Sequence, residues 1–178
     1  MKINSMAGDV LGLFAQYGFR KVSMSDIAKT AKLSRQSIYN QFGSKEAVLE
    51  WSINSYMTDM ITHIAEVLEK PADHPGDLLA EAFQKWMGNH VPMLRTTPHG
   101  NELLDIANTS AEHVIKDFEL RFREAITAFI ERHRLAPPHM AEETAYVLQM
   151  AGKGLLHKVH TSEDFAIGMQ RVLRVIFR

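Results

Sequence analysis

The sequence predicts an all-α protein, and three observations support this fold class. Apolar residues recur at three- and four-residue steps over most of the 178 positions, which is the spacing of one face of an α-helix. Serine or threonine followed three residues later by an acid precedes several of these segments, as at a helix start. Alternating β-branched runs between turn residues, which are typical of strands, are absent. We therefore expect about nine helices.

The composition indicates a folded protein rather than a disordered chain. Apolar residues make up 46% of the sequence and charged residues 23%, which suits one or two small domains with a substantial core. No apolar run is long enough for a membrane helix, and the first residues lack the pattern of a signal peptide. There is no cysteine, and hence no disulfide or thiolate site. We expect a cytoplasmic protein with no membrane segment and no cofactor.

The first predicted helix runs from about Ser5 to Tyr17. Its inner stripe is expected to be Met6, Val10, Phe14 and Tyr17. Gly18 lies just beyond the last turn and is followed by an apolar residue, a pattern typical of a glycine cap at a helix carboxyl end.

Residues 23–45 contain two short helices separated by a tight turn. Ser23, with Asp26 three residues on, forms a capping box for the first helix. Ser34 caps the second helix, in which Ile38 and Phe42 face inward at i,i+4 spacing. This arrangement predicts a helix-turn-helix, and the alternative is an ordinary polar helical hairpin.

The outer face of the second short helix carries side chains that can read DNA. Arginine makes bidentate contacts to guanine, asparagine and glutamine make them to adenine, and hydroxyls contact either. From Ser34 onward no acid, which would repel phosphate, occurs before Glu46. The exposed set is Arg35, Gln36, Ser37, Tyr39, Asn40 and Gln41.

The stretch LFAQYGFRKVSMSDIAKTAKLSRQSIYNQFGSKEAVL resembles the DNA-binding segment of the tetracycline-repressor family of bacterial transcription regulators. The resemblance runs from Leu13 to about Leu49. Its most specific parts are the Phe-x-x-x-Gly-Phe end of the first helix, the Asp-Ile-Ala of the second, and the Tyr-x-x-Phe-x-Ser-Lys-Glu junction that begins at Tyr39. One departure is Lys32, which stands in the turn where the family usually has glycine. A left-handed backbone there would cost about 1 kcal/mol. Gln36 and Gln41 also differ from the family's more common residues.

The resemblance implies a three-helix DNA-binding domain over residues 1–48 and a ligand-binding and dimerisation domain over 49–178. It implies a homodimer that binds a double-stranded DNA operator and is released by an apolar or amphipathic small molecule. Tyr39, Lys45 and Ser23 are expected to hold phosphates, and Arg35, Ser37 and Asn40 or Gln41 to reach base edges. The predicted DNA-binding residues are Ser23, Ser34, Arg35, Gln36, Ser37, Tyr39, Asn40, Gln41 and Lys45.

The charge distribution agrees with this division. Residues 1–56 carry seven basic and four acidic residues, a net charge of +3, whereas the remainder carries −4. A basic head would attract DNA while an acidic body stays away from it. Chance fluctuation of a few charges is the alternative explanation.

Five further helices are expected after the junction. They span about Lys45–Glu69, Asp77–His90, Asn101–Ala107, a segment from a Thr109–Glu112 capping box to about His133, and about His139–Lys158. Thr161 with Asp164 caps a last helix that runs to the C-terminus. Pro92 and Pro98 are expected to bracket a break in the helical structure.

The last two helices are predicted to form the dimer interface, although the pattern alone suits an intramolecular core equally well. The interface residues are Val147, Met150, Ala151, Gly154, Leu155, Phe165, Met169, Val172, Leu173 and Ile176. The middle helices are predicted to enclose an effector pocket, again with plain core as the alternative. Its lining residues are Phe83, Trp86, Met87, His90, Met93, Ile106, Phe118 and Phe122, with Asn108 as a second possible polar group.

A rival interpretation is a helical metal-dependent enzyme or metal-binding protein. The chain has nine histidines, with His157 and His160 one turn apart and Glu102, Asp105 and His113 near its centre. None of the common catalytic or metal motifs is present, however. The sequence therefore favours a DNA-binding regulator over an enzyme.

Overall fold

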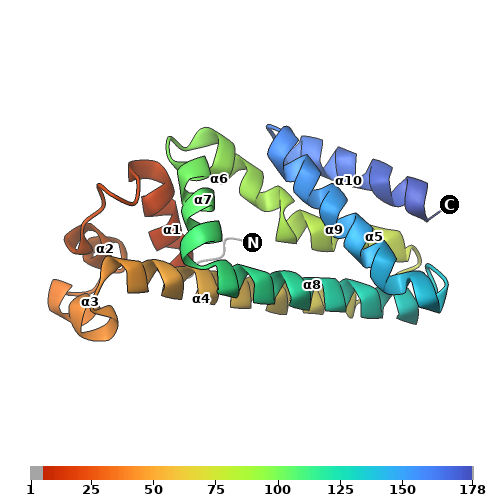
Figure 1. Ribbon diagram of the computed structural model, residues 1–178, viewed down its shortest axis with the longest axis horizontal. Coiled ribbons are helices and arrows are strands. Elements are labelled where there is room, and N and C mark those ends of the chain that lie inside the picture. Colours follow the sequence, from red (N-terminus) through yellow and green to blue (C-terminus); the bar gives the residue numbers. More distant parts are fainter. Residues whose placement is uncertain (1–5, 178) are drawn as a thin grey trace. The chain divides into compact units, whose positions relative to one another are not determined.

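The structure is a computed structural model that describes residues 6–177, and all regular secondary structure in that range is helical. The described part contains ten α-helices and two 3-10 helices (Figure 1). They are α1 (Met6–Tyr17), α2 (Met24–Thr30), α3 (Arg35–Phe42), α4 (Lys45–Leu68), α5 (Pro75–Trp86), η1 (Gly88–His90), α6 (Val91–Thr96), α7 (Gly100–Ser110), α8 (Glu112–Arg132), η2 (Pro138–Met140), α9 (Ala141–Lys158) and α10 (Ser162–Ile176). Among them, none is both long and apolar enough to cross a membrane. The predicted all-α fold is confirmed.

One compact unit contains the described residues up to 59 together with residues 93–116. Its core brings α1, α2, α3 and the first part of α4 against α7, which lies beside α1 (Figure 1). The backbone N–H of His99 donates to the carbonyl of Ala15 at 2.9 Å, joining the turn before α7 to α1. A Cβ on Gly100 would lie 2.5 Å from the carbonyl oxygen of Met93, so this close approach requires glycine.

The other compact unit contains residues 60–92 and the described residues from 117 onward. In it α10 packs on α9 and α5 (Figure 1). Gln149 is a buried polar residue, and its Nε2 donates to the carbonyl of Glu119 at 3.0 Å. The Thr161 hydroxyl accepts from the N–H of Asp164 at 3.0 Å, which confirms the predicted cap of the last helix.

The two compact units do not coincide with the predicted division at residue 48. Residues 93–116 lie in the same unit as the helix-turn-helix, although they are distant from it in sequence. The functional division into residues 1–48 and 49–178 stays a prediction.

Three local predictions are wrong. The Thr109 hydroxyl caps nothing after it, because it donates to the carbonyls of Asp105 and Ile106 inside α7. The segment after His90 is a short helix, α6, rather than a break, because Pro92 stands in its first turn, where the missing N–H costs nothing. Tyr17 is 58% exposed and does not belong to the inner stripe of α1. The expected start of α1 at Ser5 lies outside the described residues.

Candidate nucleic-acid interface

The first helix of the pair is fixed by the predicted capping box. The Ser23 hydroxyl accepts from the N–H of Asp26 at 3.2 Å, and Asp26 Oδ2 accepts from the Ser23 N–H at 2.9 Å. Asp26 Oδ2 also accepts the Ser23 hydroxyl proton at 2.7 Å. These hydrogen bonds lower the pKa of the Asp26 carboxyl. The predicted phosphate contact of Ser23 is therefore disfavoured, because its hydroxyl and amide protons are both already donated.

The turn between the two helices has a left-handed backbone at Lys32, the position where the resembled family usually has glycine. Lys32 has φ 56°, and its N–H donates to the carbonyl of Lys29 at 3.2 Å. The next N–H, that of Leu33, reaches the carbonyl of Ala28 at 2.9 Å. A lysine at positive φ stores about 1 kcal/mol of strain that glycine would not.

Helix α3 presents a polar face and buries one apolar residue. Ser34 caps it, with its hydroxyl accepting from the N–H of Ser37 at 3.0 Å. Ile38 is fully buried in the core of the unit, and Phe42 packs against Trp51 with ring centroids 5.0 Å apart. The exposed residues are the predicted ones: Arg35, Gln36, Ser37, Tyr39, Asn40 and Gln41.

The exposed side chains of α3 contact one another in pairs. Gln36 Nε2 donates to Asn40 Oδ1 at 2.7 Å, and the Arg35 guanidinium lies 5.4 Å from the centroid of the Tyr39 ring. The Ser37 and Ser34 hydroxyls lie 2.8 Å apart. These one-turn contacts restrict the rotamers of groups that would otherwise be free, so the face is partly organised before any partner binds.

Lys45 does not point outward as the resemblance predicts. Its Nζ donates to the carbonyls of Phe19, Arg20 and Val22 at 2.7, 3.3 and 2.9 Å, so all three ammonium donors have acceptors. The same ammonium lies 4.7 Å from the centroid of the Phe19 ring. This geometry argues against the predicted phosphate contact. It ties the start of α4 to the loop between α1 and α2.

The residues predicted to line an effector pocket fall into both compact units. Met93 and Ile106 belong to the unit that contains α3, and the other six belong to the second unit. In the second unit Trp86 stacks on Phe122 with centroids 4.6 Å apart and planes 5° apart, and Phe83 meets Phe122 edge-on at 5.0 Å. Phe83, Trp86, Met87, Phe118 and Phe122 are all buried. These rings fill space against one another, and their role in ligand binding stays a prediction.

His90 is a histidine whose imidazole pKa is strongly shifted by its surroundings. Burial lowers the pKa of its imidazole from 6.5 to about 4, and a hydrogen bond with the backbone of Met87 opposes this shift. The ring is therefore neutral at pH 7.

The residues predicted for a dimer interface divide into three groups by their exposure in the single chain. Phe165, Met169 and Leu173 are buried within the single chain, on a helix that packs on α9 and α5, and their assignment to an interface stays a prediction. Val147, Met150 and Gly154 are exposed on α9. The remaining four, Ala151, Leu155, Val172 and Ile176, are half-buried.

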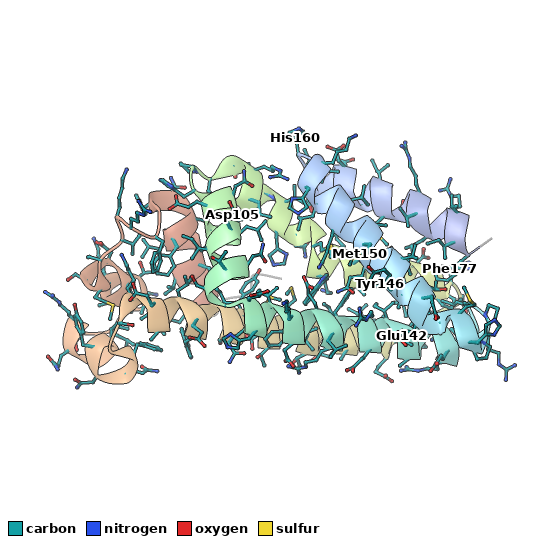
Figure 2. All side chains as sticks on the ribbon, viewed as in Figure 1. Asp105, Glu142, Tyr146, Met150, His160 and Phe177 are labelled. Atoms are coloured by element: carbon teal, nitrogen blue, oxygen red, sulfur yellow. The ribbon has the colours of Figure 1, made fainter. Side chains whose placement is uncertain are left out.

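The prediction missed other exposed apolar side chains on the last two helices. Tyr146 is 49% exposed on α9, and Ile167 and Val175 are 43% and 63% exposed on α10. Figure 2 shows Tyr146 and Met150 one turn apart on α9. Met150 was among the predicted interface residues, whereas Tyr146, four residues earlier on the same helix, was not.

The residues of the rival metal site are not gathered. Glu102 Oε2 lies 2.6 Å from His99 Nδ1, within hydrogen-bond distance. His113 Nε2 lies 3.5 Å from Glu50 Oε1. Within residues 6–177 no group of three histidine, aspartate or glutamate side chains is placed to hold a metal ion.

Comparison with known proteins connects the helix-turn-helix to a family. Residues 11–50 match the family model described as bacterial regulatory proteins, tetR family. The chain is 37% identical over 75 residues to YuxN and 27% identical over 108 residues to YezE, two HTH-type transcriptional regulators of Bacillus subtilis. These matches cover 42% and 61% of this chain but only 24% and 53% of the two relatives.

The fold agrees over nearly the whole chain. A transcriptional regulator from Rhodococcus sp. Rha1 superposes with a TM-score of 0.73, covering 96% of this chain and 93% of that one, at 15% identity. A TetR transcriptional regulator from Legionella pneumophila superposes with a TM-score of 0.71 over 100% of both chains, at 14% identity. At such identities the likeness concerns the fold alone. Residues 11–50 therefore match the tetR family of bacterial regulatory proteins, and the rest of the chain shares the fold of the solved regulators.

Proposed function

We propose that this protein is a sequence-specific DNA-binding transcriptional regulator, a repressor, and that α3 enters the major groove. The carrying observation is the exposed, acid-free face of α3, on which Arg35, Tyr39 and Asn40 are already organised by one-turn contacts. Helices that read DNA combine such base-edge donors and acceptors with phosphate contacts that fix their register.

Within this proposal Arg35 and Asn40 read bases, and Tyr39 holds a phosphate. Arg35 is the strongest candidate for a base contact, because its guanidinium can make a bidentate bond to guanine. Lys45 supports the fold instead, because its contacts with three carbonyls hold the loop before α2 and hence the placement of the α2–α3 pair.

We also propose that the protein acts as a homodimer through the outer faces of α9 and α10. Exposed apolar side chains on both helices, including Tyr146, Val147 and Val175, support this interface. In a two-fold dimer the recognition helices would lie about 34–36 Å apart, one turn of DNA, and the operator would have two related half-sites.

Release by an apolar or amphipathic effector completes the proposed function. Helix α4 begins shortly after α3, the proposed recognition helix, and continues without a break to Leu68. Its length is about 36 Å at 1.5 Å per residue. It contributes residues to both compact units. A ligand that prefers one position of this helix would change DNA affinity by its preference, typically about 1–3 kcal/mol.

DNA sequence selection on the purified protein tests the core of this proposal. We expect enrichment of a palindromic site whose half-site centres are separated by about 10 base pairs or a multiple of it. Binding that shows no enrichment over random DNA at about 150 mM salt, where non-specific contacts are weakened, would exclude sequence-specific recognition.

A further inference from the structure

The unit that contains the helix-turn-helix has a cavity of about 690 Å³ on a side formed by α1, α2 and the turn before α7. This volume is within the range of small-molecule sites. None of the lining residues belongs to α3 or to the predicted effector pocket. The lining consists of Leu13, Gln16, Tyr17, Lys21, Val22, Asp26, Lys29, Thr30, Pro98 and His99.

The lining combines an apolar wall with two cations. Leu13, Val22 and Pro98 supply aliphatic surface, and the exposed ring of Tyr17 adds aromatic surface. Within the described chain, the ammonium of Lys21 has neither an ion pair nor a hydrogen bond, although it lies beside that apolar surface. Such a combination suits a molecule with an apolar body and a negatively charged end.

The acidic group in the lining does not neutralise both cations. Asp26 is already bonded to Ser23 through its Oδ2, and the nearby charge of Lys29 contributes to its lowered pKa. Asp26 thus interacts with Lys29, whereas no ion pair involves Lys21 within the described residues. The lining thus contains two lysines against one aspartate.

His99 makes one wall of the cavity rigid. Its backbone N–H donates to the carbonyl of Ala15, and its ring Nδ1 lies 2.6 Å from Glu102 Oε2. Its ring also lies 3.1 Å from the position that a Cβ on Gly18 would occupy. Gly18 has φ 85°, so its lack of a side chain serves both the end of α1 and this close ring contact. A preformed wall lowers the entropy lost when a ligand binds.

We propose that this cavity is a binding site for a small aromatic carboxylate, with the carboxylate directed to Lys21 and Lys29 and the ring against Leu13, Tyr17 and Pro98. The site is separate from the proposed DNA interface and from the predicted effector pocket. Because α1 and α2 form its walls, the ligand would contact the DNA-binding unit directly.

Benzoate is the test ligand, and benzamide is its neutral analogue of the same shape. Titration of the full chain without DNA, followed by amide NMR shifts, should give saturable changes at residues lining the cavity. We expect benzamide to bind at least tenfold more weakly. The double variant Lys21→Gln, Lys29→Gln should weaken benzoate at least tenfold, whereas Lys32→Gln, Lys158→Gln removes the same charge elsewhere and should leave it unchanged.

Three results would overturn the proposal: equal affinities for benzoate and benzamide, equal affinities of the two double variants for benzoate, or inorganic phosphate binding as tightly as benzoate. The last would mean a simple anion site with no use for the apolar wall. Matching thermal unfolding curves of the two variants would show that both are folded. Since no DNA is present, these results do not depend on the proposed regulatory function.

Discussion

Gly152 and Gly154 lie two residues apart in α9, yet they have opposite surroundings. A Cβ on Gly152 would stand 2.9 Å from Met87 Sδ and 3.3 Å from the Phe83 ring, whereas a Cβ on Gly154 would meet nothing within 4 Å. Glycine inside a helix costs about 1 kcal/mol relative to alanine. The absence of a side chain at Gly152 lets α5 pack closely and so offsets this cost, but no contact within the described residues does so for Gly154.

The same substitution at these two positions should therefore separate folding from assembly. We expect Gly152→Leu to lower the free energy of unfolding by about 1–3 kcal/mol through overpacking. Gly154→Leu should leave that free energy unchanged or slightly raised, but weaken the dimer by about 1–3 kcal/mol. Denaturant unfolding and sedimentation measure the two effects. A wild-type protein that sediments as a monomer at micromolar concentration would remove the proposed interface.

Lys45→Met is expected to destabilise the protein without removing an ionic contact to DNA. Losing charge-assisted bonds to three carbonyls should cost about 2–3 kcal/mol of unfolding free energy. A lost phosphate contact would reduce the slope of log affinity against log salt by about 0.9. We expect the slope to stay within about 0.3 of the wild-type value. A reduced slope with unchanged stability would restore the phosphate role.

Arg35→Ala should change which sequences are preferred, whereas Tyr39→Ala should weaken all of them similarly. Loss of a bidentate contact costs about 1–3 kcal/mol at one base position. Because the guanidinium lies over the Tyr39 ring, Tyr39→Ala also frees Arg35, and the double variant should lose less than the sum of the single variants. Selection profiles and binding titrations at one salt concentration measure both effects. Identical profiles for the two single variants would refute this division of roles.

Replacing Lys32 by glycine should stabilise the protein. The left-handed backbone at φ 56° is strained for lysine but not for glycine, so we expect a gain of about 0.5–1 kcal/mol in unfolding free energy. Replacing Arg134, at φ 53°, by glycine should raise the unfolding free energy in the same way. Lys29→Gly, inside α2, is the matched control and should lose about 1 kcal/mol. Destabilisation by Lys32→Gly comparable to that control would show that the lysine side chain has an unrecognised role.

Acid should destabilise the protein through His90. The folded-state pKa of about 4 lies below the ordinary 6.5, so between these values the unfolded chain binds more protons. The contribution of neutral His90 is fully present above pH 6.5 and is lost as the pH falls towards 4, up to about 3 kcal/mol. His90→Gln should flatten that part of the curve of unfolding free energy against pH. An equally steep curve for the variant would assign the acid sensitivity to other groups.

The sequence predicted the helix-turn-helix closely because its determinants are local. The Ser23 and Ser34 caps, the burial of Ile38 and the exposure of Arg35 all follow from spacing within one or two turns. The hydrogen bonds of Lys45 were not predicted because its acceptors lie in a loop more than twenty residues earlier, and no periodicity reports such a contact.

Other differences from the prediction have the same origin in tertiary packing. The apolar stripe of the last helix was identified correctly, but a stripe does not state whether it faces the same chain or a second copy. Phe165 and Met169 are buried within the single chain. Thr109 has the spacing of a capping box with Glu112, but its hydroxyl bonds back into the preceding helix, as threonine often does.

The backbone hydrogen bond from His99 to Ala15, which joins α7 to α1, affects how the chain can fold during synthesis. The core around α1 is completed by Leu103, Ala107 and Ala111, which leave the ribosome long after the helix-turn-helix itself. The N-terminal helices must therefore wait, with their apolar side uncovered, until α7 has been translated. For the same reason a fragment cut after α4 would lack the helix that completes the core around α1.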